Sequence, residues 1–192
     1  MPVSDLIDAS LVAAVISDPR QKDNPIIACN DAFLRLTGYS REEVVGRNCR
    51  FLRGAGTLAD ATLKLREAVA AEQPVMVEIL NYRKDGTPFR NAVMIAPIFG
   101  EAGKALYFLG SQVEIAPDGP DRREQARVLI ETLSKRQRQI LIEIASGKLN
   151  KQIAFDLGLS ERTVKMHRAA VLKALGVRTS ADAIRIAVEA GF

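Results

Sequence analysis

Residues 75–115 carry the clearest pattern in the chain: three segments rich in β-branched and aromatic residues that partly alternate with polar ones. These segments are Val75–Arg83, Phe89–Phe99 and Ala105–Ile115. The turn sequence Lys84–Thr87 joins the first two, which is typical of neighbouring antiparallel strands. The pattern predicts a three-stranded meander. Two shorter apolar runs predict two further strands, Val12–Ser17 and Ile26–Cys29.

Between the second and third predicted strands, the apolar residues follow the 3.6-residue period of a helix. Thr57–Ala71 is amphipathic along its length. Asn30 and Ser40 are suitable N-caps for two shorter helices, Asp31–Leu36 and Arg41–Val45. Five strands with helices gathered between strands two and three predict an α+β domain with a five-stranded antiparallel sheet.

Residues 116–121, with two prolines, a glycine and two aspartates, cannot continue a strand or a helix. Every later segment has helical periodicity. Helices are predicted at Arg122–Thr132, Lys135–Ala145, Lys151–Leu157, Glu161–Leu175 and Ala181–Ala190, the last four after the caps Ser134, Asn150, Ser160 and Ser180. We therefore predict an α+β domain over residues 1–116, a partly helical linker over 117–131 and an all-α domain over 132–192.

Charge divides the chain at the same break. Residues 1–116 contain 13 Lys and Arg against 14 Asp and Glu, a net charge of −1, whereas residues 117–192 contain 14 against 9, a net charge of +5. A basic terminal segment suggests a polyanionic partner such as nucleic acid. Charge that only maintains solubility fits the composition equally well.

Other classes of protein are disfavoured by what the composition lacks. One histidine, His167, and two cysteines, Cys29 and Cys49, are too few for a multi-histidine metal site or a disulfide framework, so no metal is expected. No apolar run approaches the roughly 18 residues of a membrane span, and the acidic N-terminus lacks the basic start of a signal peptide. We expect a cytoplasmic protein that does not bind membranes.

A helix–turn–helix pattern lies within the basic segment. Ile153–Leu157 and Glu161–Leu175 are joined by Gly158–Ser160, a spacing that lets the second helix enter a DNA major groove. An ordinary helical hairpin has the same spacing, so the pattern alone leaves both interpretations open. The wider stretch LSKRQRQILIEIASGKLNKQIAFDLGLSERTVKMHRAAVLKALGVRTSADAI closely resembles the LuxR-type DNA-binding domain.

The resemblance implies that six polar side chains contact double-stranded DNA: Lys151, Thr163, Lys165, His167, Arg168 and Lys173. Lys165 and His167, in the TVKMH motif, would meet base edges or nearby phosphates, and Met166 would lie on the same exposed face. Arg168, Lys173 and Lys151 would reach backbone phosphates. Lys165 and Arg168 are one helical turn apart and would share a face.

An apolar stripe on the last predicted helix contains Ile184, Ala187 and Val188. In the resembled family this helix is the dimerisation surface. Ordinary packing inside the helical domain is the alternative role for the stripe.

A second motif, GRNCRFLRG at Gly46–Gly54, places Cys49 between arginines. Positive charges nearby stabilise a thiolate, so the sequence predicts a depressed pKa for Cys49 and a possible nucleophile. No histidine or acidic base stands near it, which argues against a Cys–His hydrolase or another thiol enzyme. Cys29, within the apolar run IIAC, is expected to be a buried structural cysteine.

GRNCRFLRG also resembles the GxNCRFLQ signature of the light-oxygen-voltage (LOV) photoreceptor domain, a flavin-binding branch of the PAS fold. The resemblance extends over Leu11–Ile115 and includes NDAFLRLTGYSREEVVG and EILNYRKDGTPFRNAVMIAPI. It implies a flavin cofactor and a reversible bond, formed under blue light, between the Cys49 sulfur and flavin carbon 4a. Arg53 departs from the family pattern, in which Gln is usual.

The resemblance also implies the flavin contacts: Asn48, Cys49, Arg50, Arg53, Arg66, Asn81, Asn91 and Gln112. Amides suit the polar edge of a flavin because each offers a donor and an acceptor. The odd-length loop Asp85–Thr87 would set Asn81 and Asn91 directly opposite each other. Two arginines, Arg50 and Arg66, favour FMN, with its terminal phosphate, over riboflavin; FAD is also less expected than FMN.

Together the resemblances predict a blue-light-regulated transcription factor, not an enzyme. In the dark, the last two helices would be held against the outer face of the sensor sheet in a monomer. Light would release them for homodimerisation and DNA binding, and Gln112 would start the release. A PAS-type redox or ligand sensor that controls the same DNA-binding domain is the alternative.

Overall fold

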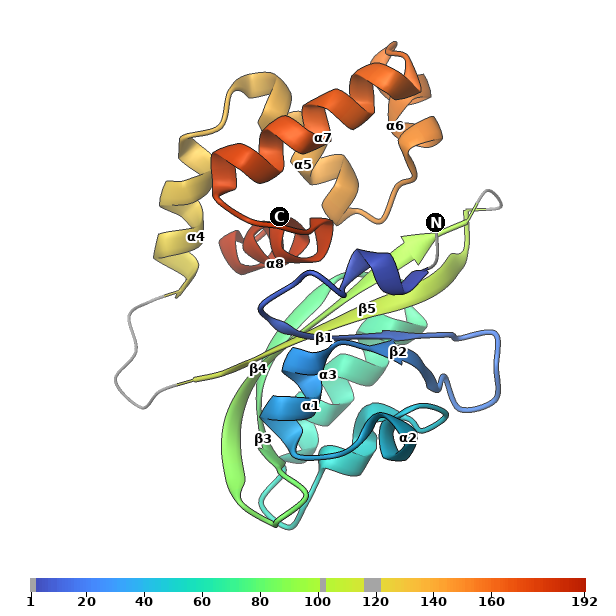
Figure 1. The fold of residues 1–192 in the computed structure, drawn as a ribbon, viewed down its shortest axis with the longest axis vertical. Coiled ribbons are helices and arrows are strands. Elements are labelled where there is room, and N and C mark those ends of the chain that lie inside the picture. The colour runs from blue at the N-terminus through green and yellow to red at the C-terminus, as the bar shows by residue number, and fades with distance from the viewer. Residues whose placement is uncertain (1–2, 101–102, 116–121) are drawn as a thin grey trace.

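A computed structural model describes residues 3–100, 103–115 and 122–192, which form two domains stacked along the long axis of the molecule (Figure 1). The break predicted at residues 116–121 lies outside the described residues. The lower domain in Figure 1 is a five-stranded antiparallel sheet with flanking helices, and the upper domain is helical. Both predicted fold classes are confirmed.

The sheet has the order β2-β1-β5-β4-β3, and every neighbouring pair is antiparallel. Its strands are β1 (Ala13–Ser17), β2 (Ile26–Cys29), β3 (Val75–Tyr82), β4 (Pro88–Phe99) and β5 (Ala105–Glu114). Strands β3, β4 and β5 form the predicted meander, and β5 also pairs with β1. The last strand of the domain is therefore the central strand of the sheet.

Short helices cover the inner face of the sheet (Figure 1). They are α1 (Asp31–Thr37), α2 (Arg41–Val44), the 3-10 helix η2 (Cys49–Leu52) and α3 (Ala59–Ala70). Asn30 caps α1 as predicted: its side-chain oxygen accepts from the Phe33 amide at 3.0 Å and from the Ala14 amide of β1 at 3.0 Å. Cys29 is buried against Phe33 in the core beneath these helices, as expected of a structural cysteine.

The helical domain contains α4 (Arg122–Glu131), α5 (Lys135–Ala145), α6 (Asn150–Leu157), α7 (Glu161–Leu175) and α8 (Ser180–Ala190). None of the described helices combines the length and apolar character that a membrane span requires. Ser134 and Ser160 cap α5 and α7 as predicted, each accepting from the backbone amide three residues later.

Two predicted caps are wrong by one residue. Thr179, not Ser180, caps α8, because its hydroxyl accepts from the Asp182 amide while the Asp182 carboxylate accepts from the Thr179 amide. Leu149, not Asn150, is the N-cap of α6, where its amide donates to Gln152 Oε1 at 2.7 Å. The side chains of Ser180 and Asn150 are used elsewhere in the domain.

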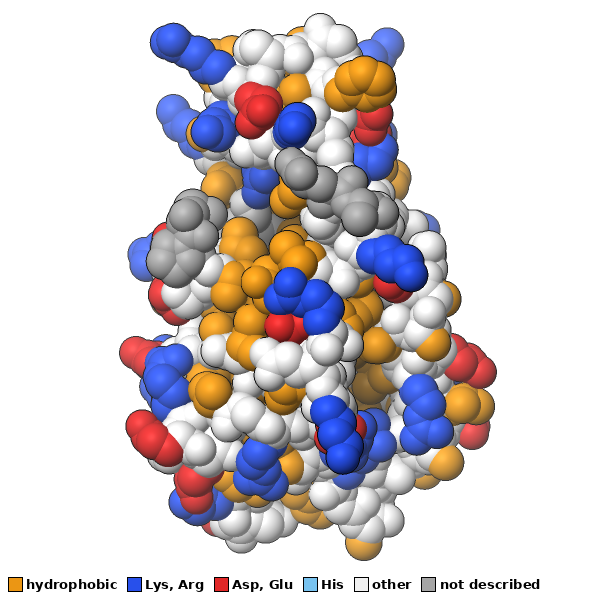
Figure 2. All heavy atoms as spheres, turned by 90° about the vertical axis from the view of Figure 1, so that its right-hand side faces the viewer, with side chains coloured by type: hydrophobic (Ala, Val, Ile, Leu, Met, Phe, Trp, Pro, Cys, Tyr) orange, Lys and Arg blue, Asp and Glu red, His pale blue; other side chains and the backbone are white. Residues whose placement is uncertain are grey.

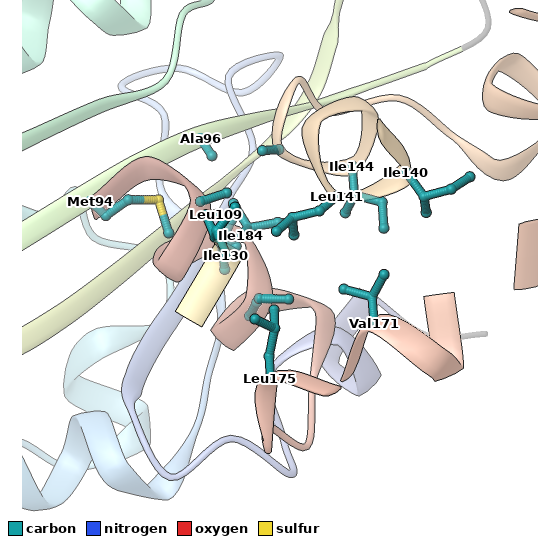
Figure 3. Close-up of a cluster of buried hydrophobic side chains, with 14 of the residues drawn as sticks. Met94, Ala96, Leu109, Ile130, Ile140, Leu141, Ile144, Val171, Leu175 and Ile184 are labelled. Atoms are coloured by element: carbon teal, nitrogen blue, oxygen red, sulfur yellow. The ribbon is translucent and has the colours of Figure 1, made fainter. Parts of the chain in front are cut away.

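The outer face of the sheet packs against the helical domain, and one buried apolar cluster runs through both (Figure 3). The sheet contributes Ala14, Ile16, Met94, Ala96 and Leu109, and the helices contribute residues that include Ile130, Leu141, Ile144 and Ile184. Figure 2 shows apolar side chains gathered at the middle of the molecule, where the two domains meet.

The helices that touch the sheet differ in part from the predicted pair. Helix α8 lies on the sheet, but α7 lies farther from it, on the upper side of the helical domain (Figure 1). The turn after α5 makes the second contact: the Gly147 carbonyl accepts from the Phe99 amide at 3.0 Å. Gly147 has a φ of +81°, and a Cβ there would lie 2.3 Å from the Pro97 carbonyl oxygen, so this close approach requires glycine.

Candidate functional site

A cavity of about 360 Å³ lies between the inner face of the sheet, η2 and α3. Most of its wall is apolar: Val15, Ile26, Leu65, Val69, Ile79, Val93, Ile95 and Phe108 line it. Amides, a thiol and arginines also line it: Asn48, Cys49, Arg50, Arg53, Arg66, Asn81 and Gln112. An apolar cavity with a few converging polar groups suits a flat heteroaromatic ligand with a polar edge.

A row of buried amides links β3, β4 and β5 on the cavity side of the sheet; Asn81 and Gln112 line the cavity itself, and Asn91 lies between them. Asn91 Nδ2 donates to Asn81 Oδ1 at 2.9 Å and to Gln112 Oε1 at 3.0 Å. All three residues are at most 5% exposed. The Asn91 Oδ1 atom is buried and has no hydrogen-bond partner in the described structure. A buried acceptor without a donor is costly, so this row fits a ligand that brings donors and acceptors of its own.

Asn81 and Asn91 share a face but are not directly opposite, so that prediction is wrong. Asn81 pairs with Phe89, and Asn91 pairs with Ile79. The register follows from the turn, because Tyr82 pairs with Pro88 and five residues remain between them. The two amides are therefore diagonal neighbours, close enough for a hydrogen bond.

Cys49 begins η2, and its sulfur lies 3.4 Å from Gln112 Nε2. Burial raises the pKa of this thiol to about 11, although the Gln112 hydrogen bond and the Arg53 charge act in the opposite direction. The predicted depressed pKa is therefore wrong. The thiol keeps its proton at neutral pH, which does not suit a thiolate enzyme.

The neighbouring arginines do not stabilise a thiolate because they point elsewhere. Arg47 donates to the Glu43 carbonyl at 3.1 Å and lies over the Phe51 ring, 4.4 Å from its centroid. Arg50 pairs with Asp23 at 2.7 Å. Asn48, predicted as a flavin amide, lines the cavity, but its amide group caps η2 and donates to the Asp23 carbonyl at 2.7 Å.

The three arginines that line the cavity, Arg50, Arg53 and Arg66, form one cationic group. The pKa of Arg53 is lowered by burial and then by the charges of Arg50 and Arg66. Within the described residues neither Arg53 nor Arg66 has an ion-pair partner, whereas Arg50 is paired with Asp23. Three guanidinium groups and one carboxylate give a net charge of +2, which matches a phosphate monoester dianion.

A second candidate site is the exposed face of α7. Five exposed residues form this face, each three or four positions from a neighbour: Arg162, Lys165, Met166, Ala169 and Lys173. Glu161 and Ala174 of α7 are exposed as well. Met166 is 62% exposed. An apolar side chain between cations can contact a thymine methyl group while the cations reach bases or phosphates. Lys151 is exposed in the first turn of α6.

Arg168 lies away from that face, contrary to the prediction. Its Nη1 donates to Asn150 Oδ1 at 2.6 Å and its Nη2 to Ser180 Oγ at 2.7 Å, and burial lowers its pKa. Arg168 thus ties α6, α7 and α8 together. Thr163 and His167 are half-buried beside the exposed face, and the Thr163 hydroxyl bonds Ser160 Oγ at 2.8 Å.

Family models divide the chain as the geometry does. Residues 12–116 match the PAS domain model. This chain belongs to the PAS family. Residues 131–187 match the GerE model of bacterial regulatory proteins of the luxR family, which suggests DNA binding by the helical domain.

Solved structures and curated relatives narrow the PAS assignment to LOV. The LOV domain from the Erythrobacter litoralis EL346 blue-light activated histidine kinase is 42% identical with a TM-score of 0.53, over 55% of this chain and 96% of that chain. The dark structure of the Aureochrome1 LOV photoreceptor is 36% identical with a TM-score of 0.56, over 62% of this chain and 86% of that chain. Blue-light-activated histidine kinase 1 of Erythrobacter litoralis is 46% identical over 153 residues, 79% of this chain and 40% of that protein.

The chain spans less than half the length of that curated relative. A blue-light-activated histidine kinase of Rhizobium johnstonii is 45% identical, and the chain spans 35% of its length. This chain contains a LOV domain followed by a LuxR-type DNA-binding domain, as the sequence motifs predict. The LOV fold implies a flavin chromophore, and the cavity described above fits one.

Sequence reasoning missed two residues of the exposed α7 face, Arg162 and Ala169. A helical-wheel count from Lys165 could have found them, because they lie three positions before it and four after it. On α8, Ile184 and Ala187 of the predicted stripe belong to the buried cluster shared with the LOV sheet, and Val188 packs against it.

Proposed function

We propose that light absorbed in the LOV cavity controls DNA binding by the LuxR-type domain. The observation that carries this proposal is the packing of α8 on the outer face of the sheet whose inner face forms the cavity. The apolar stripe of α8 is buried in this arrangement, so two copies cannot pair through it. The docked form would be a monomer in the dark, and the released form a homodimer that meets two half-sites of double-stranded DNA.

We propose FMN as the cofactor. The arginine group at the cavity, Arg50, Arg53 and Arg66, would hold its phosphate, and the amide row would hold the polar edge of its ring. When bound, the flavin would supply a ring carbon that becomes reactive under blue light and bonds reversibly to the Cys49 sulfur. On this proposal the chain is a regulator and not an enzyme, because the Cys49 sulfur bonds only the bound flavin and no substrate is converted into a product.

The residues around Cys49 suit this role. The thiol carries its own proton at neutral pH, because its pKa is about 11. This proton would pass to the flavin as the S–H bond breaks and the carbon–sulfur bond forms, so no separate base is required. Gln112 contacts both the Cys49 sulfur and the Asn91 amide. A change in hydrogen bonding at the cavity would rotate the Gln112 amide, and Gln112 belongs to the central strand. The rearrangement can therefore reach the outer face on which α8 lies.

A DNA-binding titration in the dark and under blue light tests the proposal. Light is expected to increase affinity by about tenfold or more, since a docked state typically leaves about 0.1–10% of molecules open. If Lys165 reads a base, Lys165→Ala should lower the affinity of the illuminated protein for its specific DNA site by about tenfold. If Lys165 binds a phosphate, the substitution should weaken binding to all DNA sequences equally and lower the slope of log affinity against log salt concentration by about one unit. The Lys165→Ala substitution should leave the flavin absorbance spectrum and its response to light unchanged.

Lys64→Ala, an exposed lysine on α3 of the LOV domain, is the matched control and should leave DNA affinity unchanged. Wild-type affinity that is equal in the dark and under light would contradict the proposed control by light. A Lys165→Ala protein with wild-type affinity and salt slope would remove this lysine from the DNA interface.

Arg53→Gln tests the phosphate assignment. The change removes one unpaired guanidinium and restores the residue that the LOV motif usually has. We expect the preference for FMN over riboflavin to fall by about tenfold, the effect of one charge-assisted hydrogen bond. Reloading the flavin-free protein with each flavin, followed by fluorescence quenching, measures both affinities.

Riboflavin affinity should stay within about twofold, because its ring contacts are untouched. Arg35→Gln, an exposed arginine on α1 outside the cavity, serves as the control. An unchanged FMN preference in Arg53→Gln would show that Arg50 and Arg66 hold the phosphate without it.

A further inference from the structure

Arg185 of α8 is a charged residue buried between the two domains, with only 4% of its surface exposed. Its Nε donates to Glu189 Oε1 at 2.7 Å within the same helix. Its Nη1 donates to Ser111 Oγ at 3.1 Å and to the Ala92 carbonyl at 3.3 Å, and Nη2 also donates to the Ala92 carbonyl at 3.3 Å. One guanidinium group therefore bridges α8 to both β4 and β5.

The two sheet residues that Arg185 contacts stand directly behind the amides of the cavity. Ala92 follows Asn91 on β4, and Ser111 precedes Gln112 on β5. Successive side chains of a strand point to opposite faces, so Asn91 and Gln112 face the cavity while Ser111 faces α8. On the cavity side, Asn91 Nδ2 donates to Gln112 Oε1 at 3.0 Å. The same two strands are thus bridged on one face by the amide pair and on the other by Arg185.

A buried guanidinium makes the docked state sensitive to small movements of its acceptors. Burying a charge is unfavourable unless its hydrogen bonds are satisfied, and losing one acceptor of a buried charged group is strongly destabilising. An apolar contact such as Leu109 tolerates a shift of β5 better, because apolar packing is not directional. Arg185 therefore links the stability of docking to the relative position of Ala92 and Ser111.

We propose that Arg185 is the positioning residue through which α8 responds to the amide pair in the cavity. A rearrangement of Gln112 shifts Ser111 relative to Ala92, the guanidinium loses an acceptor, and α8 leaves the sheet so that Arg185 becomes hydrated. This inference rests on the proposed function, because it assumes that light acts on Gln112. It assigns the receiving side of the signal to one side chain of the DNA-binding domain.

Ser111→Ala is the first test, with amide hydrogen exchange of α8 as the readout of docking. Removing the hydroxyl acceptor should speed exchange in the dark by about tenfold, the effect of one hydrogen bond to a charged group. Blue light should then add little. Arg185→Lys should behave in the same way, because an ammonium group keeps the charge but lacks the fork that reaches both acceptors.

Ser10→Ala is the matched control. The Ser10 hydroxyl bonds Asp182 in the first turn of α8, so this change also weakens docking, but away from Asn91 and Gln112. Exchange in the dark should rise, and the further rise under light should persist. In double variants with Gln112→Leu, the effect of Ser10→Ala on α8 exchange should add to that of Gln112→Leu. The effect of Ser111→Ala should not add, because both residues act on the same contact.

The inference is overturned if Ser111→Ala keeps the light-induced rise in α8 exchange, or if its effect adds to that of Gln112→Leu as the control does. It is also overturned if light leaves α8 exchange unchanged in the wild-type protein. DNA affinity, measured separately, tests the proposed function. A light-induced rise in α8 exchange without a change in DNA affinity would reject that function and leave the role of Arg185 intact.

Discussion

The Cys49→Ala protein is expected to bind flavin and to lose all reversible bleaching under blue light. The substitution removes the sulfur, which lies inside the cavity 3.4 Å from Gln112, while the amide row and the arginine group remain. No other described residue that lines the cavity carries a thiol. Absorbance spectra before illumination, directly after it and after return to the dark measure the effect. DNA affinity should also become independent of light.

Cys29→Ala is the matched control for the same experiment. Cys29 is fully buried in the core beneath the short helices and does not line the cavity. Its removal should lower stability modestly, because one small buried group is lost, and should leave the bleaching and its reversal in place. Bleaching that persists in Cys49→Ala, or that disappears in Cys29→Ala, would overturn the assignment of Cys49.

Most elements of the LOV domain could be predicted from the apolar pattern of the sequence. A strand with one buried face alternates apolar and polar residues, and a strand buried on both faces is a continuous apolar run. The predicted meander segments agree with β3, β4 and β5 to within one residue at each end, since their apolar runs end at turn residues such as Asp85 and Gly86. The amide contacts were harder to predict. Asn81 and Asn91 meet diagonally because the turn pairs Tyr82 with Pro88, and register depends on turn geometry that residue types do not fix.

The chemistry of Cys49 could not be read from its neighbours along the chain. The sequence places Arg47 and Arg50 within two residues of it, but Arg47 lies over Phe51 and Arg50 pairs with Asp23, which is 27 positions away. Burial then controls the pKa of the thiol. A charge that is adjacent in sequence shifts a pKa only if its side chain points toward the group.

Arg168 illustrates the same limit in the DNA-binding domain. The motif places it beside Lys165, and helical spacing alone would put the two on one face. The packing of α6 and α8 against α7 places Asn150 and Ser180 within hydrogen-bond distance of Arg168 instead. The exposed face therefore carries Arg162 in place of Arg168, and it includes the apolar Met166, as predicted.

The isolated fragment 122–192 is expected to bind DNA in the dark about 10–1,000-fold more tightly than the full chain in the dark. The range follows from the fraction of molecules, about 0.1–10%, that an inhibited two-state protein typically leaves in its open form. Deleting the LOV domain removes the sheet that packs against α8, so the stripe containing Ile184 becomes available for pairing. Titrations of the fragment and the full chain, each in the dark and under blue light, provide the comparison.

Several outcomes separate inhibition by docking from other mechanisms. The fragment should sediment as a dimer, should show a helical circular dichroism spectrum, and should bind DNA equally in the dark and under light. The lit full chain should approach the affinity of the fragment, because release restores the same surface. A folded fragment that binds no better than the dark full chain would show that the sheet does not inhibit the helical domain. Light would then have to act by creating a new contact between two LOV domains, and the buried position of α8 would be a feature of stability alone.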